Sequence, residues 1–117
     1  MSILIIDDNK DICDLLLNIL LSEGLDATIC SNPLEAKEII HKVNPQLIIT
    51  DMLMSGVDGR TLAKEIKSDT ATKNIKIMMM SAHPDAQKDS ENIGIDDFLA
   101  KPFEIDDLVQ KVQNLLQ

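Results

Sequence analysis

The stretch "ILIIDDNKDI" at residues 3–12 decides the fold, because it runs an apolar segment directly into two adjacent aspartates. The run at residues 2–6 (SILII) is continuous, rich in β-branched residues and too short for a helix. Such a run is typical of a strand buried on both faces of a parallel sheet. Asp7 and Asp8 follow this strand at once, although two neighbouring negative charges repel each other. The stretch therefore predicts a buried strand whose end carries a functional carboxylate pair.

Similar apolar runs recur and alternate with segments whose apolar residues have helical spacing. Further strands are predicted at residues 26–30, 47–50, 75–80 and 97–100. Five β–α units in succession fold as a parallel sheet with helices on both faces. The chain is therefore expected to be one α/β domain over residues 1–117.

The predicted helices have recognisable ends. Asn32 followed by Pro33 is typical of an N-cap with proline at the first helical position. Gly24 and Gly94 stand where helices should stop, because glycine adopts the left-handed conformation of a C-terminal cap at little cost. The segment at residues 84–93 is the weakest predicted helix, since it offers little apolar surface for burial. We expect it to be loosely held.

Composition excludes several classes of function. The 117 residues carry a formal net charge of -9, which disfavours direct nucleic-acid binding because that requires a basic face. No run of eighteen apolar residues predicts a membrane span, so a cytoplasmic protein without membrane insertion is expected. Cys13 and Cys30 fall inside apolar segments without metal-ligand spacing and are interpreted as core residues in a reducing compartment.

Polar residues follow the predicted strands at one edge of the sheet. Asp7 and Asp8 end the first strand, Asp51 the third and Ser81 the fourth, while Lys101 follows the fifth. Functional groups in open parallel sheets gather at the carboxyl ends of the strands, so these five side chains should meet. Three carboxylates attract a hard divalent cation such as Mg²⁺, although each aspartate alone could be a turn or cap residue. Their mutual repulsion predicts that Asp8→Ala stabilises the metal-free protein.

Four stretches, in order and spacing, resemble the landmarks of one protein family. They are "IIDDNKDI", "IITDMLMSGVDG", "MMMSAH" and "DDFLAKPF". Together they resemble the receiver domain of two-component response regulators over essentially the whole chain. The resemblance implies a flavodoxin-like (βα)5 three-layer sandwich, with a parallel five-stranded sheet in the order 2-1-3-4-5.

The resemblance also implies the chemistry of the site. Asp51 would accept a phosphoryl group from a phosphohistidine. Asp7, Asp8 and Asp51 would hold Mg²⁺ together with the backbone carbonyl of Leu53. Lys101 would neutralise the charge that develops during transfer.

Two further positions would convert phosphorylation into a changed surface. Ser81 would hydrogen-bond the phosphoryl oxygen, and Phe98 occupies the position of the family's switch aromatic residue. Ser55 departs from the pattern, because a proline is usual there, so its loop is expected to be less rigid. His83 is a loop residue close to the expected phosphate pocket and a candidate for influencing dephosphorylation, whereas His41 is interpreted as a surface residue.

The implied partners are a sensor histidine kinase or a histidine phosphotransfer protein as phosphodonor, and a downstream protein target. The chain would then be a phosphoacceptor that assists its own phosphorylation and dephosphorylation rather than an enzyme. It ends at Gln117, directly after the last predicted helix. Both a single-domain regulator and a receiver cut from a longer chain remain open.

Two other functions compete with this interpretation. A flavin- or nucleotide-binding module could use the same crevice, but such modules cradle phosphate with glycine- or hydroxyl-rich loops. This chain places "DDNKD" there and has no tryptophan or tyrosine to stack a flavin. A degenerate receiver acting only as an interaction scaffold is the third possibility, and the presence of all the expected acids and the lysine disfavours it.

Overall fold

The computed structural model describes residues 2–83, 85, 88 and 93–117, and it contains a five-stranded sheet in the order β2-β1-β3-β6-β7. All four pairings in this sheet are parallel. The strands are β1 (Ser2–Ile6), β2 (Asp26–Cys30), β3 (Leu47–Asp51), β6 (Lys76–Ser81) and β7 (Asp97–Ala100). The predicted α/β fold and its strand order are confirmed, since these are the first to fifth strands of the predicted 2-1-3-4-5 arrangement.

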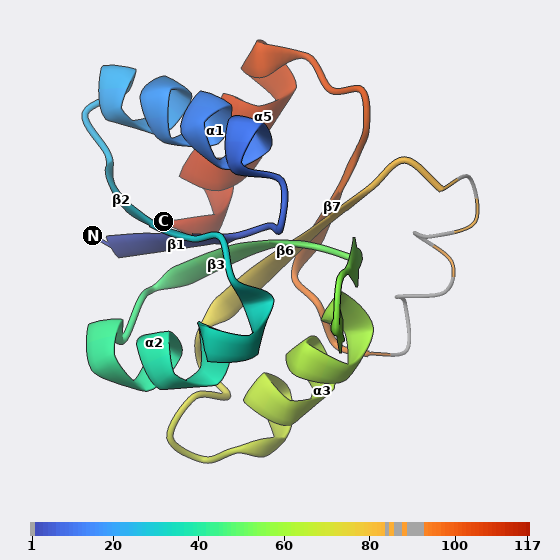
Figure 1. Ribbon diagram of the computed structural model, residues 1–117. Coiled ribbons are helices and arrows are strands. Elements are labelled where there is room, and N and C mark those ends of the chain that lie inside the picture. The colour runs from blue at the N-terminus through green and yellow to red at the C-terminus, as the bar shows by residue number, and fades with distance from the viewer. Residues whose placement is uncertain (1, 84, 86–87, 89–92) are drawn as a thin grey trace.

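Helices cover both faces of the sheet and make a three-layer sandwich (Figure 1). Helices α1 (Lys10–Ser22) and α5 (Ile105–Leu115) lie on one face, and α2 (Ala36–Val43) and α3 (Gly59–Ser68) lie on the other. Among the described residues, no helix is long and apolar enough to cross a membrane.

Each face of the sheet has its own aliphatic core. Along β1, Ile3 and Ile5 belong to the core beneath α1 and α5, while Leu4 and Ile6 belong to the core beneath α2 and α3. All four are fully buried, because successive side chains of a strand point to opposite faces. The methionine run at residues 78–80 is divided between the two cores in the same way, which confirms it as sheet core.

The predicted helix ends are mostly confirmed. The Asn32 side chain accepts a hydrogen bond from the Leu34 amide, and the segment begins as a short 3-10 helix at Pro33–Glu35 before α2. Gly24 has a φ of 75° directly after α1 and its C-cap, as a helix-terminating glycine requires. Gly94 also has a positive φ, 88°, but the helix predicted before it lies mostly outside the described residues, so its role as a helix end stays a prediction. Ile105 is 54% exposed at the first position of α5, so the buried face of this helix begins with Leu108.

One local feature differs from the sequence-based expectation, and one predicted helix lies mostly outside the described residues. A short hairpin of β4 (Leu53–Met54) and β5 (Val57–Asp58) follows β3, in a segment that had been expected to be a loop. The helix predicted over residues 84–93 lies outside the described residues, apart from Asp85, Lys88 and Ile93. The described structure therefore leaves that helix a prediction.

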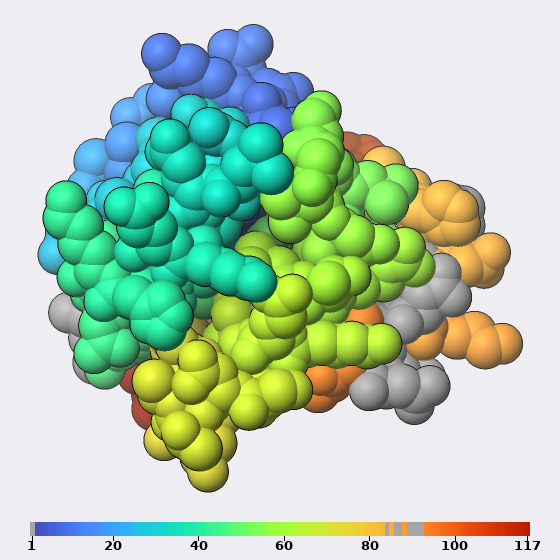
Figure 2. All heavy atoms as spheres, turned by 60° about the horizontal axis from the view of Figure 1, so that its bottom comes forward, coloured from blue at the N-terminus to red at the C-terminus, as the bar shows by residue number. Residues whose placement is uncertain are grey.

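An ion pair bridges α2 and α3 on the outer surface of the protein. Figure 2 shows this face, where α2 in teal and α3 in yellow-green lie side by side. Lys37 of α2 and Glu65 of α3 form an ion pair across the gap. His41 is exposed on the same side, as the sequence indicated.

Candidate functional site

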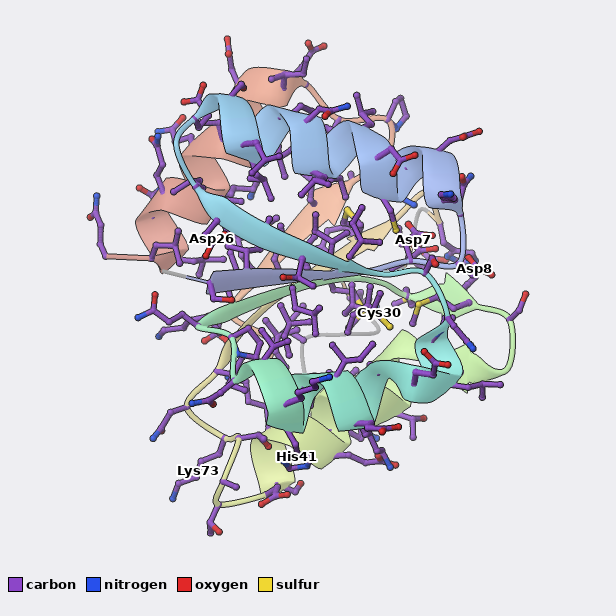
Figure 3. The ribbon with its side chains drawn as sticks, turned by 60° about the vertical axis from the view of Figure 1, so that its left-hand side comes forward. Asp7, Asp8, Asp26, Cys30, His41 and Lys73 are labelled. Carbon is purple, nitrogen blue, oxygen red and sulfur yellow. The ribbon has the colours of Figure 1, made fainter. Side chains whose placement is uncertain are left out.

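Three carboxylates meet at the carboxyl end of the sheet. Asp7 and Asp8 directly follow β1, and Asp51 is the last residue of β3, the neighbouring strand. One oxygen from each carboxylate lies within 4.8 Å of the others, close enough to share a metal ion. Figure 3 shows Asp7 and Asp8 together at this end, with Asp26 at the opposite end of β2. The parallel register thus assembles residues that are more than forty positions apart.

Lys101 brings a positive charge to the carboxylates. Its Nζ lies 3.4 Å from Oδ2 of Asp7 and 3.3 Å from Oδ1 of Asp51. The Asp7 side chain is only 1% exposed and the Asp51 side chain 15%, so both charges are largely removed from water. The Lys101 amide also donates to the Ser81 carbonyl at 2.9 Å, which ties the residue to the end of β6. A single ammonium group leaves the cluster negatively charged.

The turn between β1 and α1 holds Asp7 in place. Oδ1 of Asp7 accepts a hydrogen bond of 2.9 Å from the Asn9 amide. The Asn9 side chain is in turn the N-cap of α1 and accepts from the amides of Asp11 and Ile12. The Cys13 thiol donates to the Asp7 carbonyl at 3.3 Å from inside the helix. The start of α1 therefore fixes the position of this carboxylate.

Asp8 is exposed and is held from the opposite side of the site. Its Oδ2 accepts a hydrogen bond of 2.9 Å from the amide of Ser55, in the turn of the β4–β5 hairpin. This main-chain hydrogen bond is the largest cause that lowers the pKa of Asp8; desolvation opposes it, and the Ser55 and Asp7 side chains lower the pKa further. The hydrogen bond from Ser55 therefore opposes the repulsion among the carboxylates, and the predicted effect of Asp8→Ala on stability stays untested.

The pKa of Asp51 shifts in the opposite direction to that of Asp8. Burial is the largest effect on its carboxyl and raises its pKa, and the negative charge of Asp7 adds to this. Lys101 opposes both effects through its charge and its hydrogen bond. The ionised form of Asp51 thus depends on a nearby positive charge.

Gly59 allows α3 to approach the backbone of Asp51. A Cβ atom at this position would lie 2.3 Å from the Asp51 carbonyl oxygen, which is closer than real Cβ contacts allow. The Gly59 amide donates to the Met52 carbonyl at 2.7 Å and secures this contact. Sequence reasoning assigned no role to Gly59, although its place directly after the N-cap Asp58 was a signal.

The remaining predicted residues lie at the end of β6, on β7 and in the β4–β5 hairpin. Ser81 is 4% exposed at the end of β6, and its Oγ accepts a hydrogen bond of 3.0 Å from the His83 amide. Phe98 of β7 is half-buried and packs against the core beneath α2 and α3. Leu53 has an exposed side chain and lines a shallow hollow together with Asp8. The structure thus brings Asp7, Asp8 and Asp51 together, places Lys101 in contact with Asp7 and Asp51, and joins Ser81 to Lys101 through the main chain.

Neither cysteine adds a ligand to the carboxylate cluster, although the Cys13 thiol hydrogen-bonds the Asp7 main chain. Cys13 and Cys30 are both free and buried, and desolvation raises the pKa of Cys13 to about 11. Desolvation also raises the pKa of Cys30. Thiols with raised pKa values remain protonated at neutral pH and are poor metal ligands or nucleophiles. Their predicted place in the core is confirmed.

The donor set suits a hard divalent cation. Mg²⁺ prefers carboxylate, carbonyl and water oxygens, and it commonly uses only one or two protein carboxylates. Three carboxylates beside one ammonium group leave an excess of negative charge that such a cation would neutralise. The described residues therefore fit a magnesium site.

Comparisons with known proteins agree with this geometry. The sequence model of the "Response regulator receiver domain" family matches residues 3–113. The chain is 34% identical to "Sporulation initiation phosphotransferase F" of Bacillus subtilis (strain 168), over 97% of this chain and 92% of that protein. It is 31% identical to "DNA-binding dual master transcriptional regulator RpaA" of Synechocystis sp., over 98% of this chain and 48% of that protein.

A solved structure of a response regulator has the same fold as this chain. A putative response regulator from Chloroflexus aurantiacus J-10-fl superimposes with a TM-score of 0.92 at 33% identity, covering 98% of this chain and 96% of that one. The chain spans about half the length of several of its curated relatives, including RpaA. With a family match over nearly all its residues and the matching fold, the chain belongs to the response regulator receiver domain family of two-component systems.

Proposed function

We propose that Asp51 is the residue on which this receiver domain accepts a phosphoryl group from a phosphohistidine. The observation that carries the assignment is the position of the Asp51 carboxylate, 3.3 Å from the Lys101 ammonium and within 4.8 Å of two further carboxylates. A carboxylate oxygen attacks phosphorus, the P–N bond of the phosphohistidine breaks, and an aspartyl phosphate forms. The imidazole leaves with the bonding electron pair.

Asp7, Asp8, Asp51 and the Leu53 backbone carbonyl would hold Mg²⁺ beside the acceptor. The bound ion supplies positive charge that offsets the negative charge of the carboxylates and the phosphoryl oxygens. The support for this ligand set is the convergence of the three carboxylates, together with the hollow that Leu53 and Asp8 line.

Lys101 supplies positive charge from the protein itself. Phosphoryl transfer spreads negative charge over the phosphoryl oxygens, so catalysis depends mainly on positioning and electrostatic stabilisation. Because Lys101 contacts both Asp7 and Asp51, it is placed to move from the free carboxylate to a phosphoryl oxygen as the acceptor is modified. It also limits the pKa increase of Asp51 and keeps the nucleophile ionised.

Ser81 and Phe98 would transmit the modification to the surface. The Ser81 hydroxyl accepts its hydrogen bond from His83, which leaves its own proton available for donation to a phosphoryl oxygen. Movement of Ser81 would open space for the half-buried Phe98 of the next strand. This role rests on packing, because phenylalanine has no hydroxyl group.

The proposed partners follow from the same chemistry. A sensor histidine kinase or a histidine phosphotransfer protein supplies the phosphoryl group, and a downstream protein recognises the modified surface. We place this exchange in the cytoplasm, and we regard the domain as a phosphoacceptor that assists its own phosphorylation and dephosphorylation.

Phosphorylation with a small-molecule donor tests the assignment. The purified protein is incubated with Mg²⁺ and acetyl phosphate, and intact mass is measured. We expect one added phosphoryl group in the wild type, none in Asp51→Asn, and none when Mg²⁺ is chelated. Asp26→Asn is the matched control, because Asp26 lies at the opposite end of the sheet (Figure 3) and should leave labelling unchanged.

Two results would contradict the proposal. Labelling of Asp51→Asn at the wild-type level would show that another residue is the acceptor. Absence of labelling in the wild type, with both acetyl phosphate and a cognate phosphohistidine donor, would favour the scaffold function instead.

A further inference from the structure

One contact of the site joins segments that are far apart in sequence and involves a residue outside the family pattern. The Ser55 amide donates to Oδ2 of Asp8 at 2.9 Å, across 47 positions of the chain. A proline, which is usual in the family at this position, has no amide hydrogen and would be unable to donate. The hydrogen bond is therefore a property of this chain that the proposed phosphoryl chemistry leaves unexplained.

The contact is made by a well-defined turn. Ser55 and Gly56 connect β4 and β5, whose register pairs Met54 with Val57. Gly56 has a φ of 80°, whereas Asn44 is the only non-glycine residue with positive φ in the described part of the chain. A two-residue turn with positive φ at its second position alone corresponds to type II, in which proline is favoured at the first position. Proline at residue 55 is thus compatible with the backbone of the turn, but it lacks the amide hydrogen that bonds to Asp8.

Asp8 differs from the other two carboxylates in how it is held. Asp7 accepts from Asn9 and contacts Lys101, and Asp51 contacts Lys101 as well. Asp8 is exposed, and the hydrogen bond from Ser55 fixes its side chain from the facing hairpin. Since a carboxylate has about four acceptor positions on two oxygens, this hydrogen bond leaves capacity for a metal ion.

The hairpin also carries another predicted ligand. Leu53 is paired with Asp58 in this hairpin, and both line the hollow that Asp8 borders. A hydrogen bond between the hairpin turn and Asp8 therefore restrains both sides of the hollow at once. Without it, the exposed Asp8 side chain and the hairpin would have to be ordered when a cation binds.

We propose that the Ser55 main-chain amide is a positioning group that holds Asp8 and the β4–β5 hairpin in the arrangement that binds the divalent cation. The inference rests on the proposed function of the carboxylates as a magnesium site. Its specific content is that the amide, rather than the Ser55 hydroxyl, improves affinity by ordering the site before the metal arrives.

A matched pair of variants separates the amide from the side chain. Ser55→Ala removes the hydroxyl and keeps the amide, whereas Ser55→Pro removes both. Binding of Mg²⁺ alone is measured by calorimetry or by NMR titration in the absence of phosphodonor. We expect Ser55→Pro to weaken binding roughly twofold to fivefold, as for the ordering of one side chain, and Ser55→Ala to remain within about twofold of the wild type.

A second measurement does not depend on substitution of Ser55. In metal-free wild-type protein, the Ser55 amide should exchange with solvent more slowly than the exposed amides of other turns, because it is hydrogen-bonded. Asp8→Ala should remove this protection. Rapid exchange of the Ser55 amide in the wild type would overturn the proposal even if Ser55→Pro folded poorly.

The possible outcomes separate this inference from the proposed function. If the wild type binds Mg²⁺ and Ser55→Pro binds it equally well, the positioning role is wrong and the magnesium site stands. If Ser55→Ala weakens binding as much as Ser55→Pro, the hydroxyl is the active group and the proposal fails. If the wild type shows no Mg²⁺ binding, the proposed site itself is wrong and this inference falls with it.

Discussion

Replacement of Lys101 by methionine tests the electrostatics of the site directly. Methionine retains much of the apolar length of the side chain but leaves Asp7 and Asp51 without their shared ammonium group. Both carboxylates are largely buried, so water compensates poorly for the lost charge. In the absence of metal we therefore expect Lys101→Met to unfold more easily than the wild type at neutral pH.

The size of the effect follows from the distances and the burial. Removing one partner of a buried ion pair costs about 3–5 kcal/mol. The Lys101 side chain is 20% exposed, so a loss of roughly 2–4 kcal/mol in the free energy of unfolding is reasonable after solvent screening. For a domain of this size, that loss lowers the melting temperature by roughly 6–20 °C.

The pH dependence has a definite sign. Burial raises the pKa of Asp51 and Lys101 opposes it, so Lys101→Met should raise this pKa further. The folded variant then binds more protons than the unfolded chain between the unfolded value of 3.8 and the raised value. Its stability consequently falls as pH rises through this window, and its deficit against the wild type is largest at neutral pH.

Chemical denaturation in EDTA at several pH values measures these effects. The double variant Asp51→Asn/Lys101→Met is the control. It removes one of the two carboxylates that Lys101→Met leaves without a positive partner, so it should recover part of the lost stability. A loss below about 0.5 kcal/mol for Lys101→Met at neutral pH, the range of ordinary surface substitutions, would refute the reasoning. The same conclusion would follow if the double variant recovered nothing.

Two further predictions concern stability. Asp8→Ala removes the acceptor of the Ser55 hydrogen bond and should lower the stability of the metal-free protein near pH 7, contrary to the gain expected from repulsion alone, by less than about 1 kcal/mol because Asp8 is exposed. Its lowered pKa means that this contribution is present above the unfolded value of 3.8 and is lost as pH falls through the folded value, so wild type and variant should converge in acid melts. A more stable variant at pH 7 would show that repulsion dominates. Lys67→Met should cost about 1–2 kcal/mol, because Nζ of Lys67 lies 2.8 Å from both the Ile75 carbonyl and Oδ2 of Asp96. Urea denaturation measures this, and unaltered labelling of the variant with acetyl phosphate would confirm that the contact is structural, whereas unchanged stability would refute it.

The sequence predicted the sheet well because buried parallel strands have a strong local signal. The apolar runs at residues 2–6, 26–30 and 97–100 coincide with β1, β2 and β7. The other two strands end one residue later than predicted, and β6 also begins one residue later, at Lys76. The last residues of these two strands are Asp51 and Ser81. Their side chains are polar, so the apolar pattern did not include them in the strands. Hydrophobic periodicity therefore located the strands, while pairing with neighbours decided where they end.

The hairpin at residues 53–58 had no comparable signal. Each of its strands is only two residues long, and the pairing depends on a turn whose Gly56 has positive φ. Its position is determined by the Ser55 hydrogen bond to Asp8 and by the close packing of Gly59 on the Asp51 carbonyl. Both contacts join residues from different elements, so neither is visible as a local pattern.

By itself, the sequence determined which residues form the candidate site. In a parallel sheet the carboxyl ends of the strands lie at the same edge. Once the strands were identified, the sequence therefore predicted that Asp7, Asp8 and Asp51 lie close together. The charges on those residues were decided only by the tertiary structure. Burial raises the pKa of Asp51, whereas the Ser55 amide lowers the pKa of Asp8. Both residues are aspartates, so the sequence alone does not predict that their pKa values shift in opposite directions. The physical reason is that a pKa depends on the solvent, charges and hydrogen-bond donors around the group, and only the folded chain brings these together.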